Sequence, residues 1–347
     1  MNAILTRVTA GAFLAGGLLV VLAGCNGSSS TPSTNGGNGT PPPRNSRVYV
    51  TNASGNVASS ANPDTVDVFL ISNVLGGTGS SISPVQQIMS GSFSAAFGVA
   101  VDASANVYVT DAGSSTVQVF HFNANGSAVA PFRTISSAAM KNPYGVAVDG
   151  SGNVFVTAQG SSSAGGSVLE FSPTQSGPVT PIRTITGAAT RLAQPSGIAV
   201  KNGVVYVANA GSNTVLTFAA AANGNAAPSR VIGGSASLLN SPLGVAVGPS
   251  GAIYVANTGA NTITVYGSAG TTPVRTITST SSAPLLGPAG VALDGNGNLY
   301  VSENGTASTS NSPGGILAVY ASNANGAAAP LVQVTNVGVA AWGVAVF

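Results

Sequence analysis

Charged residues, cysteine and tryptophan are all scarce in this chain. Only 5% of its 347 residues are Asp, Glu, Lys or Arg, and the net charge is +2, whereas about a quarter of an average protein is charged. Because Lys and Arg form no clusters, we expect no electrostatic capture of nucleic acid. The single cysteine excludes internal disulfides, so packing alone must stabilise the fold.

The scarcity of histidine excludes two kinds of catalytic site. A zinc site built on histidines needs several of them, and the chain has only His121. A Ser-His-Asp triad is excluded as well. His121 follows an expected third strand and points to the rim opposite the channel mouth, and the chain contains no Gly-x-Ser-x-Gly motif. The sequence therefore assigns no catalytic residue, metal or cofactor.

Glycine and small or β-branched apolar residues are abundant instead. The chain contains 46 glycines, and 44% of its residues are hydrophobic. Disordered chains combine low hydrophobicity with high net charge, and this chain has neither property. The composition therefore predicts a folded domain with a sizeable core.

The first 25 residues have the order of an export signal. Arg7 precedes an apolar run from Val8 to Val21, and Leu22-Ala23-Gly24-Cys25 follows. The run is short for a transmembrane helix, which needs ~20 apolar residues. Because Leu-Ala-Gly-Cys resembles the bacterial lipobox, residues 1–24 are predicted to be a signal peptide and Cys25 the lipidated first residue. An Asp after the lipidated cysteine would resemble a signal for retention in the inner membrane, but Asn26 occupies this position. We therefore expect the lipoprotein in the outer membrane or at the cell surface, facing the periplasm or the exterior.

Residues 25–46 form the expected tether between the lipid and the folded domain. The stretch is rich in Gly, Ser and Thr and contains the run Pro41-Pro42-Pro43. Such a composition combines flexible coil with extended polyproline and builds no core. Only this anchor is expected to contact a membrane.

The remainder of the chain, residues 47–347, repeats itself. The motif Gly-Val/Ile-Ala-Val/Leu recurs at intervals of 47, 52, 47, 46 and 53 residues, and three further β-branched segments follow each of the first five copies. Four short strands per repeat of 45–50 residues are typical of a β-propeller blade. The motif begins at Gly98, Gly145, Gly197, Gly244, Gly290 and Gly343.

The two ends of the repeat region complete each other. The region opens with three strands (48–50, 65–69 and 85–89) and closes with a first strand alone, 343–347. Together they make one blade, which closes the ring and removes open sheet edges. We therefore predict an all-β, monomeric, six-bladed β-propeller of four-stranded blades, closed by the C-terminal strand within the N-terminal blade.

Hairpin turns recur at one register. Asp102, Asp149 and Asp294 each begin a turn that ends in Asn four residues later. An aspartate that bonds its own turn, followed by residues at positive φ, is ordinary hairpin chemistry. We predict turns here rather than calcium loops.

The repeat pattern resembles that of the NHL-repeat family. The pattern is Pro-x-Gly-Val-Ala-Val-Asp, then Gly-Asn-Val-Tyr-Val, then Asn-Thr-Val, and the resemblance covers residues 47–347. It implies a six-bladed propeller, whereas it leaves the function open, since relatives include RNA binders, extracellular binding modules, lactonases and lyases.

Aromatic residues precede three of the repeat glycines. Phe97, Tyr144 and Trp342 belong to consecutive blades, so their rings are expected side by side at the channel mouth, with Lys141 and Arg191 in loops of the same class. Such a patch suits stacking on a sugar or packing on a protein. The alternative is that the rings plug the channel as core.

Asp111 and Glu303 are the carboxylates nearest the expected channel mouth, together with Asp64. With Asn at equivalent positions of other blades they would form a calcium site, or else these side chains bond the backbone of their own turns. The calcium site would fit the metal-dependent lactonases or lyases of the family, and such an enzymatic activity is the alternative function. The favoured function is a non-enzymatic binding module for a protein or glycan. The equivalent asparagines are Asn52, Asn209 and Asn257.

Four arginines occupy one register of the expected outermost strands. Charged residues on edge strands commonly block pairing between sheets. We therefore expect a protective role for them rather than a basic binding surface. They are Arg133, Arg183, Arg230 and Arg275.

Overall fold

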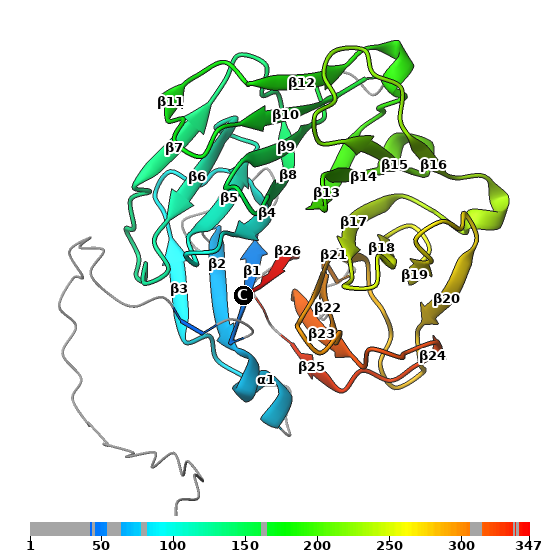
Figure 1. Ribbon diagram of the computed structural model, residues 1–347. Helices are drawn as coiled ribbons and strands as arrows, with labels where there is room; N and C mark the ends of the chain where they lie inside the picture. Colours follow the sequence, from blue (N-terminus) through cyan, green and yellow to red (C-terminus); the bar gives the residue numbers. More distant parts are fainter. Residues whose placement is uncertain are drawn as a thin grey trace, which may run out of the picture. The chain divides into compact units, whose positions relative to one another are not determined.

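The computed structural model describes residues 42–43, 46–53, 64–77, 82–160, 165–305, 314–335, 337 and 340–347. The expected signal peptide, Cys25 and nearly all of the expected tether lie outside these residues. Within them the chain forms six sheets, each with four antiparallel strands, around a common axis (Figure 1). No helix in the described part is long and apolar enough to cross a membrane.

Each sheet is one blade, with its first strand at the axis and its fourth at the rim. Blade I comprises β26 (Ala341–Val346), β1 (Arg47–Asn52), β2 (Thr65–Leu70) and β3 (Gln86–Met89). Blade II comprises β4 (Ala96–Val101), β5 (Val107–Asp111), β6 (Thr116–Phe120) and β7 (Arg133–Ser136). Blade III comprises β8 (Pro143–Val148), β9 (Val154–Ala158), β10 (Ser167–Phe171) and β12 (Arg183–Thr186).

The other three blades have the same order. Blade IV comprises β13 (Pro195–Lys201), β14 (Val204–Asn209), β15 (Thr214–Ala219) and β16 (Arg230–Ile232). Blade V comprises β17 (Pro242–Val247), β18 (Ile253–Asn257), β19 (Thr262–Tyr266) and β20 (Pro273–Thr278). Blade VI comprises β21 (Pro288–Leu293), β22 (Leu299–Glu303), β23 (Ile316–Tyr320) and β25 (Val332–Val334).

The two ends of the repeat region meet in blade I. Strand β26 pairs antiparallel with β1, with Val346 opposite Val48 and Val344 opposite Val50. The predicted closure of a six-bladed ring by the C-terminal strand is therefore confirmed.

The core lies between neighbouring blades. Apolar side chains from both faces of the middle strands form six clusters among the described residues, one at each interface between blades. Because a neighbour covers each face, the middle strands are buried almost throughout. This explains why they have consecutive rather than alternating apolar residues.

The repeat glycines bring the inner strands into close contact. A Cβ on Gly98 would lie 2.5 Å from the carbonyl oxygen of Tyr144 in the next blade, and a Cβ on Gly145 would lie 2.5 Å from that of Ser196. The other four repeat glycines face the next blade's carbonyl in the same way, and the sixth, Gly343, faces Phe97 in blade II. Glycine is therefore required wherever adjacent inner strands touch.

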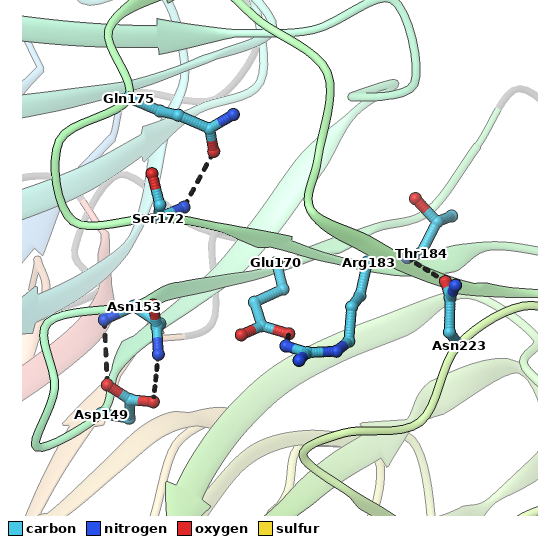
Figure 2. A network of polar contacts seen from close by, with 8 residues as sticks. All are labelled: Asp149, Asn153, Glu170, Ser172, Gln175, Arg183, Thr184 and Asn223. Atoms are coloured by element: carbon cyan, nitrogen blue, oxygen red, sulfur yellow. Dashed lines mark hydrogen bonds and ion pairs between the residues drawn. The ribbon is translucent and has the colours of Figure 1, made fainter.

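The hairpin aspartates bond their own turns, as predicted. One oxygen of Asp149 accepts hydrogen bonds from the backbone N–H groups of Ser151 at 2.8 Å and Asn153 at 2.9 Å, and the other accepts from the Asn153 side chain (Figure 2). Asp102 and Asp294 make the same bonds in blades II and VI.

The four arginines of the outer strands act differently from the prediction. Arg230 donates to the carbonyl oxygen of Ser268 at 2.6 Å and Arg275 to that of Ser322 at 2.6 Å, in both cases on the next blade. Arg133 also reaches a carbonyl of the next blade, whereas Arg183 pairs with Glu170 of its own blade at 2.6 Å (Figure 2). Three of them therefore join neighbouring blades, and most outer strand edges are covered by other segments of the chain.

Several outer edges are covered by the loop between the third and fourth strands of the following blade. Strand β11 (Gly177–Pro178) pairs parallel with β7, and β24 (Gly326–Ala327) pairs parallel with β20. The helix α1 (Ile71–Gly76) replaces this loop in blade I and contacts β25. Neither the short parallel strands nor α1 was expected from the sequence. Three short 3-10 helices are η1 (Ala188–Thr190), η2 (Ala210–Ser212) and η3 (Ser235–Ser237).

Candidate functional site

Three aromatic residues meet at one side of the channel. Phe97, Tyr144 and Trp342 lie on β4, β8 and β26, each directly before a repeat glycine. The pairing of β4, of β8 and of β26 with its neighbouring strand shifts register beside these residues. Such bulges redirect side chains from the face of a sheet.

The rings contact one another as the spacing predicted. Phe97 and Tyr144 stack with centroids 4.9 Å apart and an interplanar angle of 13°. The ring of Trp342 stands edge-on to both, at 5.1 Å from Phe97 and 6.3 Å from Tyr144. Stacked and edge-to-face pairs at these distances are favourable geometries for aromatic rings. We call Phe97, Tyr144 and Trp342 the aromatic cluster.

Hydroxyl groups of the second strands fix the backbone of the cluster. Thr110 donates to the Tyr144 carbonyl oxygen at 2.6 Å, and Ser302 donates to that of Trp342 at 2.8 Å. The same hydroxyl oxygen accepts the backbone N–H of the repeat glycine in its own blade, at 2.8 Å for Gly98. Thr51 bonds Phe97 and Gly343 in the same manner. The cluster is therefore preorganised by bonds between blades.

The channel beside the cluster is small and mainly apolar. Its open volume is about 70 Å³, and the rings share its wall with residues such as Val99, Leu243 and Ala289. This is more than the roughly 10–15 Å³ that one water molecule needs, so the channel admits water.

Two features show that the cluster is not an ordinary exposed patch. The indole N–H of Trp342 is buried without a hydrogen-bond partner. Burial also raises the pKa of the Tyr144 hydroxyl well above its usual value near 10. However, none of the three residues is buried as a whole. The cluster thus lies at the boundary between core and surface, and the two predicted alternatives, a ligand-binding patch and a core plug, stay open.

Lys141 and Arg191 lie in the loops that lead into β8 and β13, and both side chains are exposed. Arg191 has φ of 59° and follows η1, and its carbonyl accepts a bond from Asn209 at 2.9 Å. Neither cation forms an ion pair among the described residues. Both are therefore available to a ligand from solvent.

Asp111 is a structural side chain of blade II. It is the last residue of β5, and it is fully buried. Its carboxylate accepts from the backbone N–H of Ala95 at 2.7 Å, the Ser114 hydroxyl at 2.7 Å and the Gln118 amide at 3.2 Å. With its oxygens engaged in this way, Asp111 is poorly placed to hold a ligand.

Glu303 occupies the equivalent position at the end of β22 and is also fully buried. One oxygen accepts from the backbone N–H of Leu286 at 2.7 Å, and the other has no hydrogen-bond partner. Burial raises the pKa of Glu303 to about 7. A neutral, protonated carboxyl is therefore stable here at mildly acidic pH.

Asparagines at the position equivalent to Glu303 bond the equivalent loop, which precedes the first strand of their own blade. Asn209 accepts from the backbone N–H of Ala193 at 2.7 Å, and Asn257 accepts from that of Asn240 at 3.2 Å. Asn52 instead donates to Asp67 at 2.7 Å. In the described ranges no three His, Cys, Asp or Glu side chains lie together as a metal site would require. Side-chain-to-backbone bonds are thus present, but at Asp111, Asn209, Asn257 and Glu303 they reach the loop before the first strand of the same blade rather than the turn that follows each residue.

The hydroxyl groups that hold the aromatic cluster were missed at the sequence level. The signal was present, because a Thr or Ser follows the apolar triplet of four second strands. It is found at Thr51, Thr110, Thr157 and Ser302.

Comparisons with known proteins agree with the fold. Residues 239–266, which span β17 to β19, match the family model described as the NHL repeat. Comparison with the sequences of curated proteins gives no match.

Solved structures show the same architecture at low identity. A protein of unknown function from Bacteroides caccae has 13% identity and a TM-score of 0.62, with 86% of this chain and 98% of that chain covered. A chain of the nidogen/laminin complex has 15% identity and a TM-score of 0.57, with 86% and 97% covered. The WD40 β-propeller domain of Doa1 has 11% identity and a TM-score of 0.56, with 86% and 82% covered. The protein is thus a six-bladed β-propeller, and part of its blade V matches the NHL repeat.

Proposed function

We propose that this propeller is a non-enzymatic binding module whose ligand, a protein or a glycan, contacts the aromatic cluster at the channel mouth. The single observation that carries the proposal is the cluster itself. Three rings from three blades lie in mutual contact beside the channel, held by bonds between blades. Rigid aromatic side chains contribute large contact areas at low entropic cost.

The indole N–H of Trp342 is buried without a partner, so a ligand acceptor would reach it only if the rings move apart on binding. A buried donor without a partner costs roughly 1–3 kcal/mol. A hydroxyl or carbonyl oxygen of a ligand, or an ordered water, would recover this energy. Lys141 and Arg191 add exposed donors on neighbouring loops.

The surroundings of the carboxylates favour binding over metal-dependent hydrolysis. A hard cation takes six or more oxygen ligands, and Asp111 already accepts bonds from its own blade. The appearance of this fold in a chain of the nidogen/laminin complex is consistent with a role in protein association.

We further propose that the module is displayed at the outer membrane or cell surface by a lipid on Cys25, with residues 25–46 as the tether. The lipobox-like sequence supports this placement.

The binding proposal is tested by probing glycan and protein arrays with the wild-type domain and the Trp342→Ala variant. We expect a defined ligand whose binding falls at least thirtyfold in the variant, since an interface anchor contributes about 2 kcal/mol or more. A ligand bound equally by both proteins would place the site elsewhere.

A further inference from the structure

The outer edge of blade III is covered by an Asn-Gly-Asn segment from blade IV. The backbone N–H of Thr184 donates to the Asn223 side chain at 2.9 Å (Figure 2). Gly224 donates to the Thr184 carbonyl at 2.7 Å, and its own carbonyl accepts from the Thr186 N–H at 3.0 Å. The side chain of Asn225 then accepts from the N–H of Ala189 in η1 at 2.8 Å.

The same arrangement covers two other blades. In blade I, Asn125 accepts from the Gln87 N–H at 2.9 Å, and Gly126 forms a parallel bridge with Ile88. In blade V, Asn325 accepts from the Thr276 N–H at 3.0 Å, and β24 pairs parallel with β20. An Asn-Gly segment is therefore the standard cover of an outer edge in this molecule.

Blade IV has the same edge without the cover. After β16 the helix η3 repeats the geometry of η1, and the residues that end the two helices, Leu238 and Arg191, share φ of 59° and ψ of 18°. However, β16 is the outermost strand of its sheet, and within the described part of the chain no segment pairs with its outer side.

The space normally taken by the second asparagine is empty at blade IV. A Cβ on Gly187 would lie 2.5 Å from the side-chain oxygen of Asn225. The equivalent glycine of blade IV is Gly234, and a Cβ there would meet nothing within 4 Å. The position is therefore open as well as unpaired.

A shorter loop explains the missing cover. Between the last aromatic residue of the third strand and the next proline, blade IV has nine residues (219–227, from Phe218 to Pro228). Blade V has only six (267–272, from Tyr266 to Pro273). The shorter loop contains no Asn-Gly pair. Arg230 holds this short loop through the carbonyl of Ser268, at 2.6 Å. The loop therefore cannot extend along β16.

We infer that the outer edge of blade IV is a peptide-binding site for an extended Asn-Gly-Asn segment of a partner protein. The segment would pair parallel with β16. By equivalence with blade III, its bonds would use the N–H and C=O of Val231 and the N–H groups of Gly233 and Ala236. Addition of a strand to an exposed sheet edge is a common mode of peptide recognition. This site is separate from the aromatic cluster, so it does not depend on the proposed function.

A partner segment fits this edge better than a second copy of the chain. Among the described loops between third and fourth strands, the Asn-Gly segments at residues 125–126, 223–225 and 325–326 already cover edges of their own molecule. Two β16 edges of three residues each would share few backbone bonds.

The test uses an acetylated and amidated peptide with the sequence of residues 220–228, Ala-Ala-Ala-Asn-Gly-Asn-Ala-Ala-Pro. Binding to the whole domain is measured by calorimetry or by amide chemical shifts. We expect saturable binding that is lost when Asn-Gly-Asn in the peptide becomes Ala-Ala-Ala. Val231→Pro, which removes the outward N–H, should weaken binding at least tenfold, whereas Val231→Thr should not.

A second variant leaves β16 itself unchanged. Replacing residues 267–272 with the sequence of residues 219–227 should cover the edge from within and abolish peptide binding, with the melting temperature retained. The inference is overturned if the wild-type domain does not bind the peptide. It is also overturned if the grafted variant binds the peptide as well as wild type, or if β16 instead mediates dimerisation of the wild-type domain.

Discussion

The carbonyl oxygen of Tyr144 lies 2.5 Å from the position that a Cβ on Gly98 would take. The closest atoms are backbone atoms of the adjacent inner strand, so they cannot yield as a flexible side chain would. Equivalent contacts run around the whole ring. The repeat glycine thus sets both the distance between blades and the position of the aromatic residue beside it.

Gly98→Ala should therefore destabilise the domain by about 1–3 kcal/mol, the usual range for overpacking. Gly91→Ala is the matched control, because a Cβ on Gly91 meets nothing within 4 Å. Its effect should be neutral or slightly stabilising. Chemical denaturation compares the two, and equal free energies of unfolding would contradict the close approach of the inner strands.

Deletion of residues 343–347 should unfold the domain rather than shorten it. The deletion removes most of β26, including the buried side chains of Val344 and Phe347. Burial of each such side chain contributes roughly 1.5–3 kcal/mol, and the typical net stability is only about 5–15 kcal/mol. Circular dichroism checks the result, and an unchanged melting temperature would show that the ring does not depend on this strand.

Stability should fall as the pH rises from about 4.5 to 7. The folded-state pKa of Glu303, about 7, lies above its ordinary value of 4.5. The native state therefore binds this proton more tightly, and the stabilisation is present at low pH and lost as the carboxyl ionises. The loss is on the order of 3 kcal/mol at most.

Glu303→Gln should flatten this pH dependence, because the amide cannot ionise. The comparison is the difference in unfolding free energy between pH 5 and pH 8 for wild type and variant. Burial also raises the pKa of Asp67, so some dependence should persist in the variant. Equal pH dependence in the two proteins would show that Glu303 is ionised in the native state.

Cys25→Ala should release the protein from membranes without unfolding it. Cys25 is the sole cysteine and precedes the propeller by the whole tether. Fractionation of cells and a melting curve check the two halves of this expectation. A Cys25→Ala protein that still sediments with membranes would refute the lipid anchor.

Most of the fold could be predicted from the sequence because its determinants are local and repeated. The repeat glycine, the apolar triplet of the second strand and the turn aspartate recur in several blades, so each copy supports the others. The closure of the ring could be predicted because the repeat region begins and ends with an incomplete blade.

The sequence was less informative where contacts cross between blades. The Asn-Gly loops look like ordinary turns, and only the structure shows that Asn223 bonds Thr184 of the preceding blade. The role of Arg230 and the helix α1 likewise depend on neighbours distant in sequence. The aromatic cluster was predictable because its members share one register, whereas its partial burial was not.

The central claim is that a ligand binds at the aromatic cluster, and the fluorescence of Trp342 tests it most directly. The chain contains one tryptophan, so its emission reports on this site alone. Titration with the ligands selected on the arrays should give a saturable shift in emission, and Tyr144→Ala should weaken that binding at least tenfold. The account would be contradicted by saturable binding in calorimetry that leaves the Trp342 emission unchanged and that is as tight in the Tyr144→Ala variant as in wild type.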